Sequence, residues 1–208
     1  MAMLAFHMRR LLSLVLVAML LPAGCQFTTS AALVHNKPLE GDPLHQPLDT
    51  SAAPVQNRRL LRYAISQGPA IAPAYDVAVC TAFLEKVLRP FVDLTAKERQ
   101  LLHVNLGKQT LAEARQQQSA TLRGVQAALT VAGKGTIVPS LSEAQPGDLV
   151  QFWYWNKGHC GILKASYPAL GLMALYSSAQ STNGFGTQLY WIPAELYIVR
   201  LKDMHPSA

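Results

Sequence analysis

Hydrophobic patterning divides this chain near Gly133, and the division limits the fold classes that the chain can adopt. Before Gly133, apolar residues recur at helical spacing. After it, short runs rich in aromatic and β-branched residues alternate with turns that contain Gly, Pro or Asn. Helices followed by consecutive antiparallel strands define an α+β domain. We therefore expect N-terminal helices packed on an antiparallel β-meander.

The helical half is expected to contain helices at residues 58–66, 75–89, from 95 onward, and 109–132. Thr95 is followed three residues later by Glu98, which is the pattern of an N-terminal capping box. The strand half is expected to contain strands at residues 149–155, 159–165, 172–178, 188–192 and 196–201.

The first 25 residues are typical of a bacterial signal peptide. Arg9 and Arg10 precede an apolar run over residues 11–21, and Ala23 and Gly24 stand directly before Cys25. The apolar run is about half the roughly 20 residues needed to span a bilayer. The sequence therefore predicts export rather than a permanent transmembrane anchor.

Residues 21–25, Leu-Pro-Ala-Gly-Cys, resemble the lipobox of bacterial lipoproteins, with Pro22 where an aliphatic residue is usual. The resemblance implies diacylation of Cys25 and attachment to a membrane through the lipid. Simple secretion is the alternative. Gln26, rather than Asp, after the cysteine favours the outer membrane if the cell is Gram-negative.

The chain is expected to divide into three parts. The leader occupies 1–25, a flexible tether with four prolines occupies 26–57, and a single catalytic domain occupies 58–208. The net charge is +6, which includes Arg9 and Arg10 of the leader, and no run of Lys or Arg is present. We therefore expect no nucleic-acid partner.

Two cysteines remain beyond the leader, Cys80 and Cys160. In an exported protein they could form one structural disulfide. The other interpretation makes Cys80 a nucleophile, because it lies near the expected start of a helix, where exposed N–H groups and the helix dipole favour a thiolate. His159 opens a strand after a turn and could serve as its base.

Three segments carry a resemblance to a known family. Val79-Cys-Thr-Ala-Phe-Leu, then Gln145-Pro-Gly-Asp-Leu-Val-Gln-Phe-Trp, then Gly158-His-Cys-Gly-Ile-Leu resemble the papain-like cell-wall hydrolases of the NlpC type and their CHAP amidase relatives. The resemblance covers about residues 75–200. It implies a papain-like fold in which Cys80 is the nucleophile and His159 the general base.

The resemblance also implies a third polar residue, on the next strand, that orients the imidazole. Ser178 and Gln180 are the candidates, with Gln180 slightly favoured, because alternation places both on one side of that strand. Alternation also predicts that Cys160 faces away from Cys80 if His159 faces toward it.

Three further residues are candidates for contact with the substrate: Tyr75, Asp76 and Trp153. Tyr75 could line the cleft near an oxyanion, although packing would explain it equally well. Asp76 could instead cap the helix of Cys80, and Trp153 is expected to belong partly to the core and partly to a cleft wall.

The expected function is that of an envelope-anchored cysteine hydrolase that cleaves amide bonds in the stem peptides of peptidoglycan. No metal and no organic cofactor is needed for this chemistry. One alternative is an N-acetylmuramoyl amidase or a transacylase on the same fold. Another is a non-catalytic envelope lipoprotein with a Cys80–Cys160 disulfide.

Overall fold

The computed structural model describes residues 43–103, 106 and 108–203. The expected leader at 1–25, the lipidation site at Cys25 and the expected tether as far as residue 42 lie outside the described residues. No helix in the described part combines the length and the apolar character needed to cross a bilayer.

Within the described residues, six strands form one antiparallel sheet in the order β1-β6-β2-β3-β4-β5. The strands β2 to β5 form the predicted meander, and β6 returns to pair with the other edge of β2. The strand β1 was not predicted because its four residues are too short to show alternation. The bounds are β1 Gly135–Val138, β2 Leu149–Tyr154, β3 Lys157–Tyr167, β4 Leu172–Ala179, β5 Gly184–Trp191 and β6 Glu195–Leu201.

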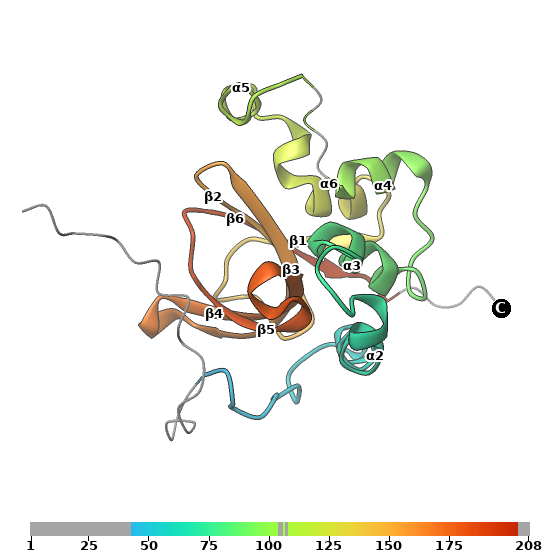
Figure 1. Cartoon of the computed structure of the whole chain (residues 1–208), viewed down its shortest axis with the longest axis vertical. Helices are drawn as coiled ribbons and strands as arrows, with labels where there is room; N and C mark the ends of the chain where they lie inside the picture. The colour runs from blue at the N-terminus through green and yellow to red at the C-terminus, as the bar shows by residue number, and fades with distance from the viewer. Residues whose placement is uncertain (1–42, 104–105, 107, 204–208) are drawn as a thin grey trace, which may run out of the picture. The chain divides into compact units, whose positions relative to one another are not determined.

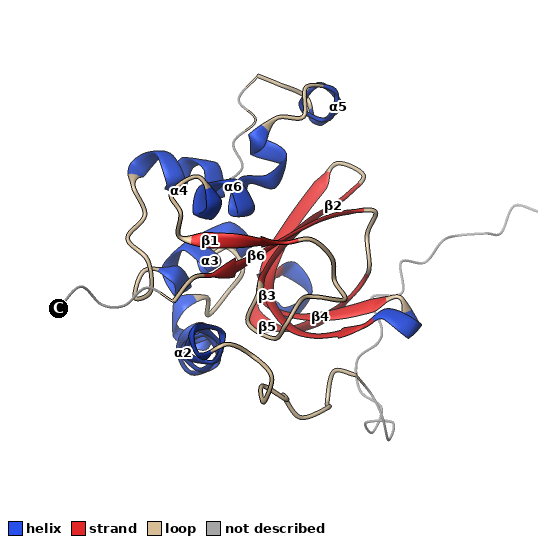
Figure 2. Cartoon of the chain, turned by 180° about the vertical axis from the view of Figure 1, so that it is seen from behind, coloured by secondary structure: helices blue, strands red, loops and turns tan. Residues whose placement is uncertain are grey.

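Helices precede this sheet along the chain, so the α+β class is confirmed. The helices α2, α3, α4 and α6 lie on one side of the sheet in both views (Figures 1 and 2). Their bounds, with those of α5 and the short 3-10 helices, are α2 Val55–Ile71, α3 Cys80–Leu88, α4 Ala96–Leu102, α5 Leu111–Gln116, η1 Ala120–Arg123, α6 Gly124–Thr130, η2 Pro168–Leu170 and η3 Gln180–Thr182.

Three helix boundaries differ from the sequence-based expectation. The helix α3 begins at Cys80, not near Tyr75. The expected helix 109–132 is broken, because Gln118 adopts a left-handed backbone (φ 49°) and the side chain of Ser119 accepts from Thr121 N–H to start a new turn. The helix α2 continues past Gly68, whose missing side chain leaves room for the Phe185 ring.

The described part of the expected tether packs against the domain. Leu48 contacts the buried core, and Asn57 is fully buried within the first turns of α2. The capping box of α4 is confirmed: Glu98 N–H donates to Thr95 Oγ1 (3.3 Å), and Thr95 N–H donates to Glu98 Oε2 (2.7 Å).

The two faces of the sheet carry separate hydrophobic clusters. Side chains that alternate toward the helices, such as Leu149 and Ile162, join the core with Phe83 and Leu84 of α3. The other set forms a second cluster on the opposite face: Val138, Leu141, Val150, Phe152, Leu163, Met173, Leu175 and Ile198. We call these the helix face and the opposite face.

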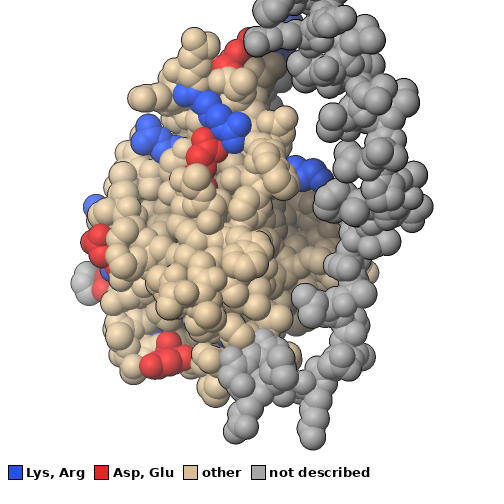
Figure 3. All heavy atoms as spheres, turned by 90° about the vertical axis from the view of Figure 1, so that its left-hand side faces the viewer, with Lys and Arg blue, Asp and Glu red and all other residues tan. Residues whose placement is uncertain are grey.

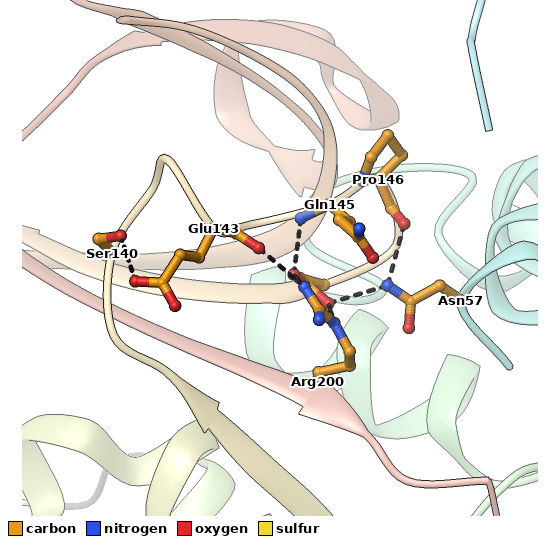
Figure 4. A network of polar contacts seen from close by, with 7 residues as sticks. Asn57, Ser140, Glu143, Gln145, Pro146 and Arg200 are labelled. Atoms are coloured by element: carbon orange, nitrogen blue, oxygen red, sulfur yellow. Dashed lines mark hydrogen bonds and ion pairs between the residues drawn. The ribbon is translucent and has the colours of Figure 1, made fainter. Parts of the chain in front are cut away.

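A buried carboxylate ties α2 to the sheet (Figure 4). Asp148, which is fully buried, accepts from Asn57 Nδ2 (2.8 Å), from Gln145 N–H (2.8 Å) and from the Arg200 guanidinium (2.8 and 2.7 Å). The bond from Gln145 closes the Pro146-Gly147 turn that leads into β2. The network joins α2, the start of β2 and β6, and so fixes the frame that holds the site.

Candidate active site

Cys80 is the first residue of α3, and the packing of that helix fixes its position. Phe83, Leu84, Val87 and Leu88 are all buried against the sheet. The N-cap residue Val79 supplies no side-chain hydrogen bond. The N–H groups of the first turn are therefore left for another acceptor, and they place partial positive charge beside the Cys80 sulfur.

His159 lies on β3 among aromatic rings of the opposite face. Its ring centroid is 5.6 Å from that of Phe152 and 5.1 Å from that of Tyr190. Its Nε2 is hydrogen-bonded to Ser177 Oγ (3.0 Å) and to Tyr190 Oη (2.9 Å). Three side chains thus hold the imidazole by packing and by polar contacts at the same nitrogen.

The hydrogen bonds around Tyr190 indicate the tautomer of His159. The Tyr190 hydroxyl donates to Gln188 Oε1, and the amide of Gln188 donates in turn to Ser181 Oγ. Because a phenol has one proton to donate, its oxygen accepts from His159 Nε2–H. This leaves Nδ1 as the basic nitrogen of the ring.

The Cys80 thiol interacts with both Cys160 and His159. A hydrogen bond with Cys160 holds the pKa of Cys80 well below its ordinary value; burial raises it, and hydrogen bonding to and the charge of His159 lower it further. Contact with Cys80, together with complete burial, raises the pKa of Cys160 well above its ordinary value. Cys160 therefore stays protonated and donates its S–H to a Cys80 thiolate.

Cys160, rather than His159, lies in the cluster that contains Cys80, so the condition under which Cys160 was expected to face away is not met. Alternation itself holds, because Cys160 lies in the helix-face cluster whereas His159 contacts Phe152 on the opposite face. However, the β3–β4 ladder begins only at Ile162, so among the described residues this edge of β3 has no strand partner beside His159 and Cys160. At this open edge the Cys80 thiol can contact Cys160 on the helix face and also His159 on the opposite face. Both described thiols are free.

The structure does not bring the two predicted orienting residues to His159. Gln180 is exposed at the start of η3, and Ser178 is buried with a hydroxyl that has no partner among the described residues. Ser177 contacts His159 instead. Ile162 pairs with Tyr176 on the helix face, so Ser177 shares the opposite face with His159, and Ser178 does not. Alternation within β4 alone could not show which of its two sides faces His159.

The three candidate substrate residues have different surroundings. Burial, and then the charges of Cys80 and Cys160, raise the pKa of Tyr75, which places its hydroxyl near the thiols. Asp76 is exposed and does not cap α3, whose N-cap is Val79. Trp153 is buried and donates from Nε1 to the Leu122 carbonyl (2.8 Å), so it belongs mainly to the core.

One polar cluster beside the site was missed by sequence reasoning. His103, at the end of α4, is hydrogen-bonded through Nε2 to Glu85 Oε2 (2.6 Å) and through Nδ1 to Thr81 Oγ1 (3.3 Å). Glu85 also binds Arg89 (3.0 Å). Because His103 comes from another helix, its sequence spacing gave no signal. The cluster fastens α4 to the first turn of α3, next to Cys80.

Comparison with known proteins found no match: no family model, no curated protein and no solved structure is similar to this chain. The function is therefore inferred from the geometry of the site and from the motifs in the sequence.

Proposed function

We propose that this chain is a cysteine hydrolase of amide bonds, with Cys80 as nucleophile and His159 as general base. The observation that carries the proposal is the position of Cys80, which is the first residue of α3 and lies next to His159, whose ring is held by Ser177 and Tyr190. Contact with Cys160, and then with His159, favours a pKa of Cys80 below its ordinary value against the effect of burial. A structural cysteine in an apolar core would have a raised pKa instead.

The chemistry follows from these contacts. The Cys80 proton passes to His159, and the thiolate attacks the amide carbon. The resulting oxyanion is stabilised by N–H groups at the start of α3, including that of Cys80. His159 then protonates the departing amine, which leaves a thioester on Cys80. Neutral His159 removes a proton from water, the hydroxide attacks the thioester, and the acid product and the Cys80 thiol are released.

The orienting role falls to Ser177 and Tyr190 together. Both are hydrogen-bonded to Nε2 of His159, so in the proposed reaction Nδ1 exchanges the proton with Cys80. In a catalytic triad the third residue holds the imidazole in the correct tautomer. Here the Gln188–Tyr190 chain does so without a carboxylate.

For the substrate we propose peptidoglycan stem peptides, and for the fold the papain-like arrangement of the NlpC and CHAP type. The support is the order of the Cys80, Pro146-Gly-Asp148 and Gly158-His159 segments, together with the signal peptide and the lipobox-like Cys25. The protein would then act in the envelope, held at a membrane through lipid on Cys25. An amidase or transacylase would use the same residues on a different acyl group.

The contact between the two thiols favours one further alternative. A Cys80–Cys160 disulfide would convert the site into a structural crosslink in a non-catalytic envelope lipoprotein. The intact mass of the folded protein after iodoacetamide treatment separates the two: an alkylated Cys80 supports the hydrolase, and a quantitative disulfide contradicts it.

The decisive experiment is cleavage of purified peptidoglycan, followed by mass spectrometry of the released muropeptides. The wild-type chain should release peptides, whereas Cys80→Ala and His159→Ala should release none above background. His45→Ala is the matched control, because it removes an exposed histidine before α2 that has no role in the proposed reaction. Full release by Cys80→Ala would overturn the proposal.

A further inference from the structure

The stretch from Ala165 to Ala194 carries no charged side chain. It contains no Asp, Glu, Lys, Arg or His, although it includes the end of β3, then η2, β4, η3 and β5. Figure 3 looks onto the side of the molecule where η2 connects β3 to β4, and the charged side chains visible there gather toward the top and the margins. The exposed outer surface of this stretch has no part in the proposed catalytic steps.

Two large apolar side chains are exposed together at one corner of this surface. Leu170, the last residue of η2, is 56% exposed, and Trp191, the last residue of β5, is 69% exposed. Trp191 pairs with Leu172, and a Cβ added at Gly171 would lie 3.8 Å from the Trp191 ring. The N–H of Ile192 donates to the Gly171 carbonyl (2.8 Å), which holds the ends of η2 and β5 side by side. We call Leu170, Gly171 and Trp191 the apolar corner.

The chain that leads back to Cys25 enters the described structure beside the apolar corner. Tyr167, directly before η2, donates from Oη to the Pro43 carbonyl (3.0 Å), and Lys164 donates from Nζ to the Leu44 carbonyl (2.6 Å). The segment between Cys25 and Pro43 spans at most about 60 Å when fully extended. A lipid on Cys25 therefore confines Pro43, and the corner beside it, to the neighbourhood of a membrane.

The chemistry of the apolar corner suits the surface of a bilayer. Tryptophan concentrates at membrane–water interfaces, because its ring is apolar and its N–H can still reach water or a headgroup. An uncharged surface also enters the headgroup region without the cost of desolvating a side-chain charge. Two side chains bind a membrane weakly by themselves. The lipid raises their effective concentration at the bilayer, so weak contacts are sufficient.

The other strongly exposed tryptophan has different surroundings. Trp155, in the turn between β2 and β3, is 88% exposed. Its carbonyl accepts from Arg115 Nη2 (2.7 Å), and Arg115 forms an ion pair with Glu195 (2.9 Å). Charged groups next to Trp155 oppose contact with a bilayer, because they would have to give up water. Trp155 is therefore a matched reference for Trp191 within the same chain.

We propose that the apolar corner rests on the bilayer that holds the lipid of Cys25, with the Trp191 ring between headgroups and acyl chains and Leu170 beside it. The inference rests on the proposed lipid attachment, and not on the proposed hydrolysis. It adds an orientation to a protein that the lipid alone would only tether. Because His159 lies near the start of β3 and the corner lies at its end, this orientation does not place the bilayer on the open edge that carries the thiols.

The test uses the full chain, extracted from bacterial membranes and reconstituted in vesicles of phosphatidylethanolamine and phosphatidylglycerol. In half of the samples the acyl chains carry bromine, which quenches a tryptophan that touches them. The chain has three tryptophans, and Trp153 is buried. Brominated vesicles should quench the wild type and Trp155→Phe, whereas Trp191→Phe should lose most of the quenching.

A second pair of variants leaves Trp191 in place. In the Trp155→Phe background, Leu170→Gln should reduce the quenching of Trp191, because it removes the other apolar contact. Ile137→Gln is the matched control, since Ile137 is 51% exposed on β1, at the opposite edge of the sheet from β5. It should leave the quenching unchanged.

The outcomes separate this inference from the proposed function. Quenching requires no turnover, so a protein that cleaves no peptidoglycan but shows quenched Trp191 retains the membrane contact and loses the hydrolase. The inference is overturned if quenching is absent, if Trp155 carries it, or if the mass of the N-terminal peptide shows no lipid on Cys25. Unquenched Trp191 together with concentration-dependent dimers would assign the corner to a second copy of this chain instead.

Discussion

The Cys160 thiol stands beside the nucleophile as a hydrogen-bond donor, in addition to His159. Its own pKa is raised by contact with Cys80 and by burial, so it keeps its proton while Cys80 loses one. Two cysteines in contact thus have opposite acidities, and only one of them is expected to be reactive.

Replacing Cys160 with alanine should raise the pKa of Cys80. The thiolate would lose a hydrogen bond to a charged acceptor, worth about 1.5–3 kcal/mol, which corresponds to roughly one to two pH units. The measurement is the rate of iodoacetamide alkylation of Cys80 between pH 3 and 10. Cys160→Ser keeps a donor and should shift the midpoint less. Superimposable profiles for the wild type and Cys160→Ala would contradict the assignment.

The partners of His159 lead to a second prediction. Tyr190→Phe should lower kcat about fivefold to tenfold, since it removes a hydrogen bond of about 1 kcal/mol that favours the productive tautomer. Ser177→Ala should have a similar effect. The double variant should lose more than the product of the two, because each partner can serve Nε2 when the other is absent.

A structural role alone would not change the tautomer, so the second readout is the pair of imidazole ¹⁵N shifts of His159. In Tyr190→Phe the population protonated at Nδ1 should rise. Full activity with unchanged ¹⁵N shifts would show that Tyr190 only packs against the ring.

The sequence predicts the individual motifs of the site, but it does not predict which side chains from other strands contact them. A cysteine at a helix start and a histidine at a strand start both follow from local patterns. Ser177 and Tyr190 do not, because their approach to His159 depends on the register in which β4 pairs with β3 and on that in which β5 pairs with β4. Cross-strand partners are set by tertiary pairing, which leaves no signal in the spacing of a single strand.

At the scale of elements, those supported by several independent signals were predictable, and the break in the long helical segment 109–132 was not. The capping box of α4 and the largely apolar strand β2, bounded by turn residues, each carry such signals. The expected helix 109–132 has helical composition throughout, yet Gln118 and Ser119 break it where η1 docks on Trp153. A hydrogen bond from Trp153 to Leu122 outweighed helix propensity, which is a weak term per residue.

The Asp148 network should dominate the docking of α2 on the sheet. Asp148→Asn removes the paired charge of the partly buried Arg200 and the best acceptor of Asn57, and should lower the free energy of unfolding by about 3 kcal/mol or more. Urea denaturation measures the loss. Arg89→Gln, which breaks an exposed pair with Glu85, is the control and should cost less than about 0.5 kcal/mol. Equal losses would contradict the role of the network.

For the whole molecule, the site depends on helices that approach the open edge of β3 and are held there by few polar contacts. Glu98 joins the start of α4 to the residue that precedes β1. It completes the capping box of α4 and accepts from Lys134 Nζ (2.6 Å), just before β1. The hydrogen bond from Lys134 lowers the pKa of Glu98 below its ordinary value; burial opposes this, and hydrogen bonds with Thr95 add to it.

A carboxyl group whose pKa is lower in the folded than in the unfolded chain stabilises the fold above its unfolded pKa, which is about 4.3 for Glu. The contribution of Glu98 should therefore be complete at neutral pH and disappear as the pH falls below about 4. Glu85, whose pKa is lowered by His103 and Arg89 against the effect of burial, should behave in the same way.

Urea denaturation of the wild type and of Glu98→Gln from pH 7 to pH 3 measures this linkage. The two stability curves should be separated at neutral pH and converge in acid, because protonated Glu98 and glutamine are both uncharged. Thr110 and Glu113 form a second capping box on α5, and Glu113 has no lysine partner among the described residues, so Glu113→Gln should show a smaller separation. A constant gap between wild type and Glu98→Gln down to pH 3 would mean that the carboxylate charge does not hold α4 against the sheet.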